Sequence, residues 1–173
     1  MSLRNVIKIV SGGQTGADRA GLDAAIALGL EYGGWIPQGR VAEDGMVPLE
    51  YLNTSEYSSP KYAPRTKANV RDSDATLIIV ESFPLSQGTA LTLRSAENHK
   101  KPHKVTCICD ADAAEDVIDW LNSFPALTRP FVLNVAGPKE SVCVGIQERG
   151  RKFLVRVLDD NACGHSKTKK VMK

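Results

Sequence analysis

The sequence lacks an apolar run of the roughly 18 residues that a helix needs to span a membrane. Its first apolar stretch is interrupted by Lys8, and no small-residue cleavage site follows it, so the pattern of a secretory signal is missing as well. These two absences argue against an integral membrane protein. They predict a soluble protein of the cytoplasm, with no membrane among its partners.

Cysteine and histidine are scarce, with four and three residues, and no two cysteines form a C-x-x-C pair. His99 and His103 have the spacing of a helical metal site, but Pro102 lies between them and breaks such a helix. Cys107 and Cys109 alternate along an expected strand, which predicts two free, buried thiols on one face. No metal site is therefore predicted.

Two common nucleotide-binding signatures are also missing. No Gly-Lys-Ser/Thr tripeptide occurs, which excludes a P-loop NTPase, and no glycine run has the spacing G-x-G-x-x-G. The formal net charge is only +2, while residues 164–173 alone hold four lysines and no acid. The rest of the chain is thus slightly acidic, and nucleic acid is not the expected partner.

The order of the expected elements predicts a single ligand-binding domain over residues 1–160, followed by a basic, disordered tail over residues 161–173. Apolar strand patterns alternate with helical patterns, beginning with a strand, a glycine-rich loop, a helix and a strand within residues 5–37. The further expected strands cover residues 75–81, 104–109 and 131–136, and the helices cover residues 17–30, 64–74, 89–100, 112–123 and 145–158. The predicted fold is α/β, a Rossmann-like, doubly wound and mainly parallel sheet with helices on both faces.

In such a sheet, ligands bind beyond the carboxyl ends of the strands, at the point where the strand order reverses. The loops that follow Val10, Val80 and Ala136 are expected to converge there. Residues 38–64 are rich in Gly, Pro, Asn and Ser, and a segment of this length is typical of a binding loop or lid.

The glycine-rich loop at residues 11–16 is the strongest functional signal. Glycine lets the backbone approach a ligand closely, and the free amides at the start of the next helix favour an anion. Thr15 is expected to cap that helix, Arg19 to pair with a phosphate, and Asp18 to bind a ligand hydroxyl or stabilise the helix dipole. The predicted phosphate-binding residues of the loop are Gly12, Gly13, Gln14, Thr15 and Gly16. A tight turn without a ligand is the alternative.

A second candidate is Gly88-Thr89, which lies between a buried strand and the next helix. Its loop begins a helix with hydroxyl groups at Ser86 and Thr89, so it offers either a second anion site or an ordinary helix cap. Its value depends on its expected closeness to the glycine-rich loop.

Polar residues in two other segments complete the predicted binding site. Arg40 and Asp44 lie in the long loop, where they either contact a ligand or form an ion pair within the loop. Arg65 and Asn69 are four residues apart on one helix face, where they either reach the site or stabilise the outside of the helix.

Four sequence blocks together resemble the putative molybdenum carrier family, a branch of the lysine-decarboxylase-like, Lonely-Guy-type Rossmann proteins. They are GQTGADRAGLD at 13–23, GRxAEDG at 39–45, RTxxNVxDSD at 65–74 and NVAGP at 134–138. The resemblance implies a Rossmann-like fold, assembly into a dimer or tetramer, and binding of molybdenum cofactor, a phosphorylated pterin, or of a nucleotide. It also implies molybdoenzymes as protein partners.

The same resemblance argues against one known activity. Lonely-Guy-type phosphoribohydrolases carry a catalytic glutamate three residues after a Gly-Thr pair, whereas Thr92 stands at that position here. A hydroxyl cannot replace a carboxylate as a general acid or base. The favoured hypothesis is therefore a carrier without assigned catalytic residues. The alternative is a nucleotide-processing hydrolase that takes its carboxylate from Asp18, Glu43 or Asp44.

Overall fold

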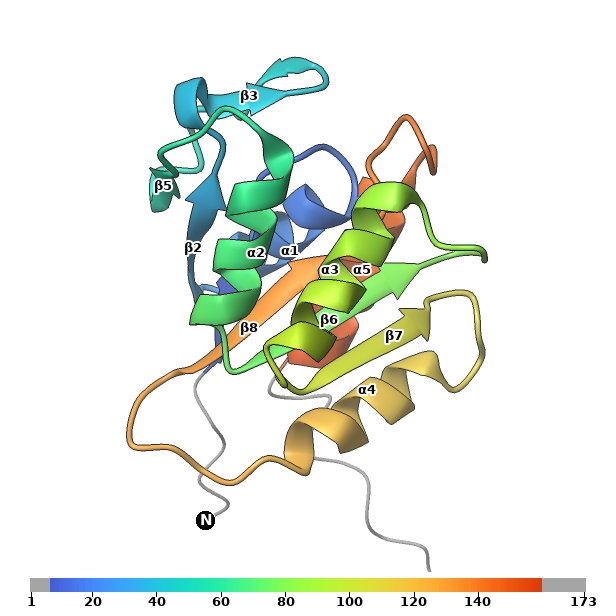
Figure 1. The fold of residues 1–173 in the computed structure, drawn as a ribbon. Coiled ribbons are helices and arrows are strands. Elements are labelled where there is room, and N and C mark those ends of the chain that lie inside the picture. The colour runs from blue at the N-terminus through green and yellow to red at the C-terminus, as the bar shows by residue number, and fades with distance from the viewer. Residues whose placement is uncertain (1–6, 160–173) are drawn as a thin grey trace, which may run out of the picture.

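A computed structural model of the chain describes residues 7–159, whose main feature is a six-stranded parallel sheet between two layers of helices (Figure 1). The strands, in their order across the sheet, are β5 (Thr54–Glu56), β2 (Glu31–Ile36), β1 (Ile7–Val10), β8 (Phe131–Ala136), β6 (Ala75–Val80) and β7 (His103–Cys107). Every neighbouring pair is parallel, which confirms the predicted doubly wound α/β fold.

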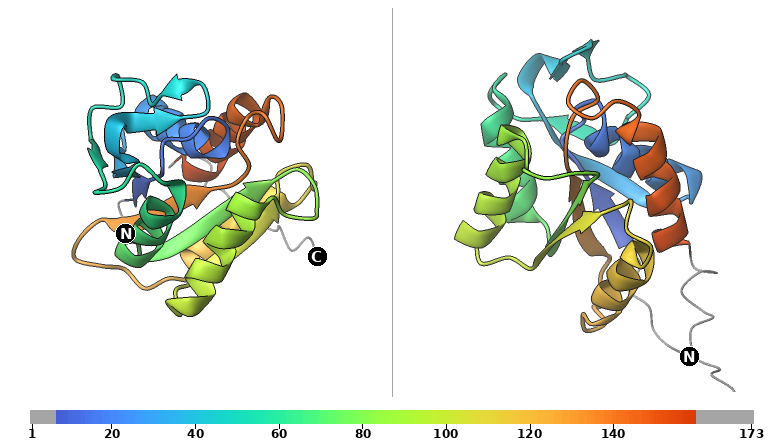
Figure 2. Two further views of the ribbon diagram at one scale, coloured as in Figure 1. Left: turned by 45° about the horizontal axis from the view of Figure 1, so that its top comes forward. Right: turned by 90° about the vertical axis from the view of Figure 1, so that its right-hand side faces the viewer.

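The helices lie on both faces of this sheet, as the right-hand view of Figure 2 shows. One face carries α2 (Tyr62–Asp72) and α3 (Gln87–Asn98), and the other carries α1 (Ala17–Ala27), α4 (Ala113–Asn122) and α5 (Ile146–Leu158). Between the sheet and the second group lies the main apolar core, which includes Ile79, Leu133 and Leu154. Each such side chain contributes roughly 1.5–3 kcal/mol by its burial, so the sheet is a rigid support for the loops at its ends.

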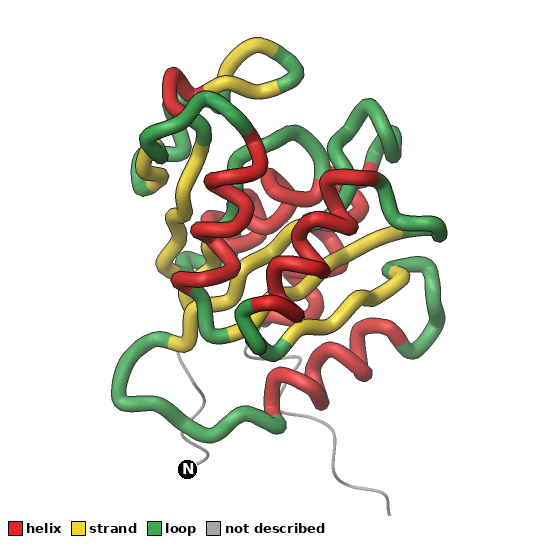
Figure 3. The backbone as a smooth tube through the Cα atoms, viewed as in Figure 1, coloured by secondary structure: helices red, strands yellow, loops and turns green. Residues whose placement is uncertain are grey.

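The strand β8 is the last in the chain but lies in the middle of the sheet, between β1 and β6. Val10 pairs in register with Asn134, and Ile78 pairs with Ala136. The loops after β1, β6 and β8 therefore open side by side at the carboxyl end of the sheet, as Figure 3 shows. The predicted convergence of these three loops is confirmed.

The segment 38–64 contains more regular structure than the sequence analysis expected. A short helical turn, η1 (Gln38–Arg40), leads into a two-stranded hairpin made by β3 (Val41–Ala42) and β4 (Gly45–Met46), and β5 then joins the edge of the main sheet. The three residues of β5 pair with Gly34, Trp35 and Ile36 of β2. The segment is thus not a free loop, because both its hairpin and its edge strand are attached to the rest of the fold.

One prediction about the strand β7 is wrong. The strand ends at Cys107, because the amide of Asp110 donates to the Cys107 carbonyl and closes a turn. Cys109 therefore lies beyond the strand and is exposed, and Cys107 is only half-buried. The predicted basic tail at residues 161–173 lies outside the described residues. Within residues 7–159, no helix is both long and apolar enough to cross a membrane.

Candidate functional site

A cavity of about 400 Å³ lies between α2 and α3, at the carboxyl end of β8. This volume is within the range of small-molecule sites. All three converging loops contribute to its wall. The lining residues are Gln14, Asp18, Tyr62, Arg65, Thr66, Ser86, Gln87, Gly88, Thr89, Leu91, Thr92, Ala136, Gly137, Lys139 and Val142.

Arg65 is the most unusual residue of this cavity, because it is a buried cation with unused hydrogen-bonding capacity. Its side chain is 10% exposed, and its Nη1 lies 3.1 Å from Oδ2 of Asp18. A Cβ atom at Gly12 would lie only 1.6 Å from that same Nη1, so the guanidinium rests directly on the glycine-rich loop. Its buried Nε has no hydrogen-bond partner among the described residues.

Asp18 lies in the first turn of α1 and is the one carboxylate among the described residues that line the cavity. Its Oδ2 also accepts the amide of Gln14, at 3.2 Å. Burial raises the pKa of Asp18, while Arg65 and the Gln14 amide act in the opposite direction. Asp18 and Arg65 thus form a buried ion pair in the cavity wall, which fixes the position of the guanidinium.

The amides of the glycine-rich loop are largely used by the protein itself. The amide of Thr15 donates to the side-chain oxygen of Gln14, and the amide of Gly16 donates to Gln147. The amide of Ala17 donates to the carbonyl of Pro138, at 3.0 Å. A Cβ atom at Gly16 would lie 2.5 Å from that carbonyl oxygen. Gly16 therefore has a packing role, because it lets the loop after β8 close over the start of α1.

The structure places Arg19 and Asp44 together and away from the cavity. Both terminal nitrogens of the Arg19 guanidinium contact the Asp44 carboxylate, at 2.6 and 2.8 Å, and its Nε donates to the carbonyl of Gly13. Arg40 donates to the carbonyls of Val47 and Pro48 and so stabilises its own loop. These three predicted ligand contacts are ion-paired or hydrogen-bonded within the protein.

Thr15 does not cap α1, contrary to the expectation from the sequence. The N-cap residue is Gly16, which has no side chain that could accept a hydrogen bond from the helix. The Thr15 hydroxyl instead donates to Glu43 of the β3–β4 turn. Glu43 also accepts the amide and hydroxyl of Ser141 and contacts Lys139 at 2.9 Å. Although desolvation opposes it, these hydrogen bonds lower the pKa of Glu43 to about 2. Glu43 therefore connects the β3–β4 hairpin to the glycine-rich loop and to the loop after β8.

The start of α3 has a more open geometry. Ser86 caps the helix by accepting the amide of Thr89, and a Cβ atom at Gly88 would meet nothing within 4 Å. The hydroxyl of Thr92 donates to the Gly88 carbonyl one turn earlier. Gly88 and Thr89 thus line the cavity as part of a helix N-terminus with free space in front of it.

Asn69, the remaining predicted contact, lies one helical turn beyond Arg65 on the same buried face of α2. Its side chain accepts the amide of Trp35 and donates to the Trp35 carbonyl, both at 2.8 Å. It therefore fixes the position of β2 and does not line the cavity with Arg65. Sequence reasoning missed Tyr62, Lys139 and Val142. Of these three, only Lys139 could have been found from the sequence. It directly follows Gly137 and Pro138, in a loop that was expected to converge on the site.

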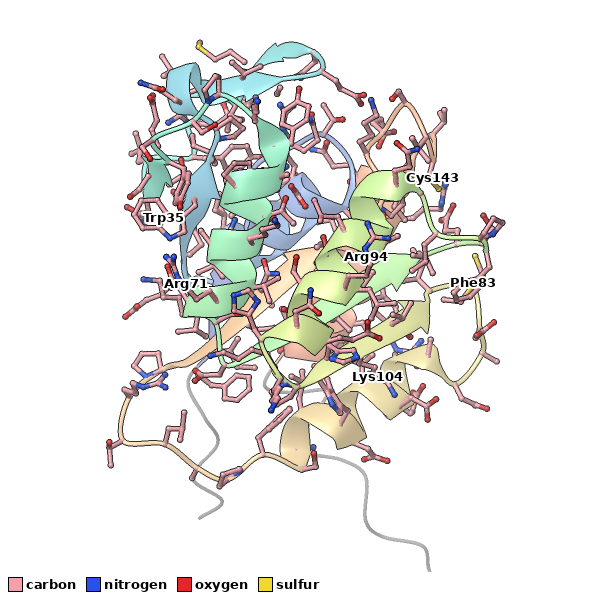
Figure 4. All side chains as sticks on the ribbon, viewed as in Figure 1. Trp35, Arg71, Phe83, Arg94, Lys104 and Cys143 are labelled. Atoms are coloured by element: carbon pink, nitrogen blue, oxygen red, sulfur yellow. The ribbon has the colours of Figure 1, made fainter. Side chains whose placement is uncertain are left out.

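Several other features of this end of the molecule lie outside the residues that line the cavity. Within the described part of the chain, no three His, Cys, Asp or Glu side chains are grouped as a metal site requires. Cys143 donates to the Glu81 carboxylate, and burial together with Glu81 raises the pKa of this thiol to about 11. Phe83, labelled in Figure 4, lies 65% exposed in the loop after β6. The chemistry of the site is thus set by Arg65, Asp18, Lys139 and the start of α3.

Comparisons with known proteins identify a family and a crystal structure that the chain resembles. A family model described as "Circularly permutated YpsA SLOG family" matches residues 9–158. A crystal structure of a protein named "putative molybdenum carrier protein", from Syntrophus aciditrophicus SB, is 43% identical, with a TM-score of 0.77. The match covers 90% of this chain and 97% of that one. Among curated proteins, none matches the chain.

Proposed function

The chain belongs to the circularly permutated YpsA SLOG family, and because the similar crystal structure is that of a protein named putative molybdenum carrier protein, we propose that this chain is a carrier for a phosphorylated, ring-containing molecule. Molybdenum cofactor, a phosphorylated pterin, is the favoured cargo, and a nucleotide is the second. The resemblance to molybdenum carrier proteins that the sequence motifs predicted is confirmed by the family match and the similar crystal structure. The ligand itself is a proposal that rests on the cavity.

The observation that carries this proposal is the buried Arg65 with its free Nε. A buried, charged donor without a partner costs free energy unless an acceptor takes its hydrogen bond. A phosphate suits a guanidinium well, because two of its oxygens match the spacing of the donor nitrogens. Asp18 contacts Nη1, so Nε is the donor of Arg65 that has no partner among the described residues and is left for a ligand.

The start of α3 supplies the second part of the proposed phosphate site. The amide end of a helix carries a partial positive charge, and Gly88 leaves room for an oxyanion to approach it. By contrast, several amides at the start of α1 are already bonded to Gln14, Pro138 and Gln147. We therefore place the phosphate between Arg65 and Gly88, and give the glycine-rich loop the role of supporting Arg65.

The remaining walls of the cavity suit the ring of such a ligand. Tyr62, Leu91 and Val142 offer apolar or aromatic surface within the same cavity. The centroid of the Tyr62 ring lies 5.9 Å from Cζ of Arg65, so this aromatic side chain lies close to the proposed phosphate donor. A pterin and a purine base have the same requirements, and the proposal includes both for this reason.

The first test is mass spectrometry of small molecules released from the purified protein. Release of a pterin phosphate or a nucleotide would support the proposal and identify the cargo. Calorimetric titration with AMP then measures binding directly, with Arg65→Gln expected to weaken it strongly. Arg71→Gln is the matched control, because Arg71 lies on the same helix but is exposed and paired with Asp72 (Figure 4). Equal effects of the two variants would contradict the proposed site.

One observation favours a second function, a hydrolase that acts on a nucleotide-like substrate. Asp18 is buried in the cavity wall with a raised pKa, as a general acid requires, whereas Glu43 and Asp44 do not line the cavity. A screen of nucleoside monophosphates for release of the base tests this activity. Turnover that is lost in Asp18→Asn would replace the carrier hypothesis. Binding without turnover would support the carrier.

A further inference from the structure

The cavity contains two cationic side chains among its described residues, and they differ in kind. Arg65 is buried and fixed between Gly12 and Asp18. Lys139 comes from the loop after β8, and its side chain is 44% exposed. The lysine has a flexible four-carbon stem and a compact charge, so it can move without disturbing the fold.

Each of these cations already has a carboxylate partner. Asp18 lies 3.1 Å from Arg65, and Glu43 lies 2.9 Å from Lys139. The two pairs leave the resting cavity without net charge from these side chains. An incoming anion gains full attraction from one of the cations only if that cation leaves its carboxylate.

The two pairs differ in how easily they can separate. Asp18 is buried, so a loss of its partner would leave an uncompensated charge inside the protein. Glu43 keeps three other hydrogen bonds when Lys139 leaves, from the Thr15 hydroxyl and from the amide and hydroxyl of Ser141. The Lys139–Glu43 pair, which is the more exposed of the two, is therefore the one that opens at smaller cost.

We propose that Lys139 exchanges the Glu43 carboxylate for the phosphate of the ligand, so that Glu43 sets the affinity of the cavity for anions. Glu43 is then a positioning residue, which holds Lys139 by an ion pair and competes with the ligand for it. This inference rests on the proposed phosphate-binding function. It adds a specificity determinant that lies on the β3–β4 hairpin, outside the cavity wall.

The test is a set of calorimetric titrations with AMP and adenosine. Glu43→Gln keeps an oxygen for Thr15 and Ser141 but removes the competing charge, so AMP should bind roughly fivefold more tightly while adenosine binds as before. Lys139→Gln should weaken AMP binding by a similar factor without changing adenosine binding. The double variant should behave like Lys139→Gln, because Glu43 acts through Lys139.

Glu97→Gln serves as the control, since Glu97 is exposed near the end of α3 and does not line the cavity. It removes the same charge and should leave both affinities unchanged. AMP binding that is the same in wild type and Glu43→Gln overturns this inference and leaves the proposed function intact. An absence of AMP binding in both proteins contradicts the inference and the AMP-binding form of the proposed function together. Thermal melting of each variant confirms that the compared proteins are folded.

Discussion

The guanidinium of Arg65 lies against the backbone of Gly12, in the space that a Cβ atom would occupy. The glycine-rich loop therefore makes room for Arg65 of α2, a residue that follows Gly12 by 53 positions in the chain. This contact links the strongest sequence motif to Arg65, the buried cation among the described residues of the cavity wall, and it is open to a direct test.

Gly12→Ala should displace Arg65 and disturb the site. We expect a loss of about 1–3 kcal/mol in the free energy of unfolding, because the new methyl group overpacks a buried contact. AMP binding should weaken roughly tenfold or more through the loss of charged hydrogen bonds. Urea denaturation and calorimetry measure the two effects. Gly88→Ala is the control for stability, since its methyl group meets nothing within 4 Å.

Arg19 should matter for stability and not for binding. Its guanidinium is buried and makes two hydrogen bonds to Asp44, so Arg19→Gln should cost about 2–4 kcal/mol in urea denaturation. The affinity of the folded variant for AMP should stay unchanged, in contrast to Arg65→Gln. If Arg19→Gln instead loses AMP affinity and keeps normal stability, Arg19 binds the phosphate, as the sequence predicts.

These two arginines show how much of the site the sequence could predict. The βαβ unit and the place of the glycine-rich loop within it follow from local patterns and are confirmed, whereas phosphate binding by that loop stays a prediction. The partner of Arg19 was not predictable, because Asp44 reaches it only through the folding of a hairpin that has no apolar alternation. The edge strand β5 was missed for the same reason, since its residues Thr54–Glu56 are all polar.

Thiol labelling should distinguish the cysteines. In a Cys163→Ser background, which removes the cysteine outside the described residues, an aromatic disulfide reagent at pH 8 should modify Cys109 first because it is exposed. Cys143 should react slowest, since its thiol is hydrogen-bonded to Glu81 and its pKa is about 11. Peptide mapping after timed quenching gives the order. Fast labelling of Cys143 would show that its contact with Glu81 does not persist in solution.

The contribution of Glu43 to stability should depend on pH in a defined direction. Its pKa in the folded protein is about 2, below the ordinary 4.5, so the folded state holds the carboxylate in its charged form. The stabilisation is therefore fully present above pH 4.5 and is lost as the pH falls toward 2. Urea denaturation of wild type and Glu43→Gln should differ by about 1–2 kcal/mol at pH 7.

That difference should shrink steadily between pH 4.5 and 2, because the protonated carboxyl of the wild type then resembles the amide of the variant. Comparison of the two proteins at each pH removes the titration of all other carboxylates from the result. If the difference between wild type and Glu43→Gln stays constant over this range, the negative charge of Glu43 does not contribute to stability, and the prediction is wrong.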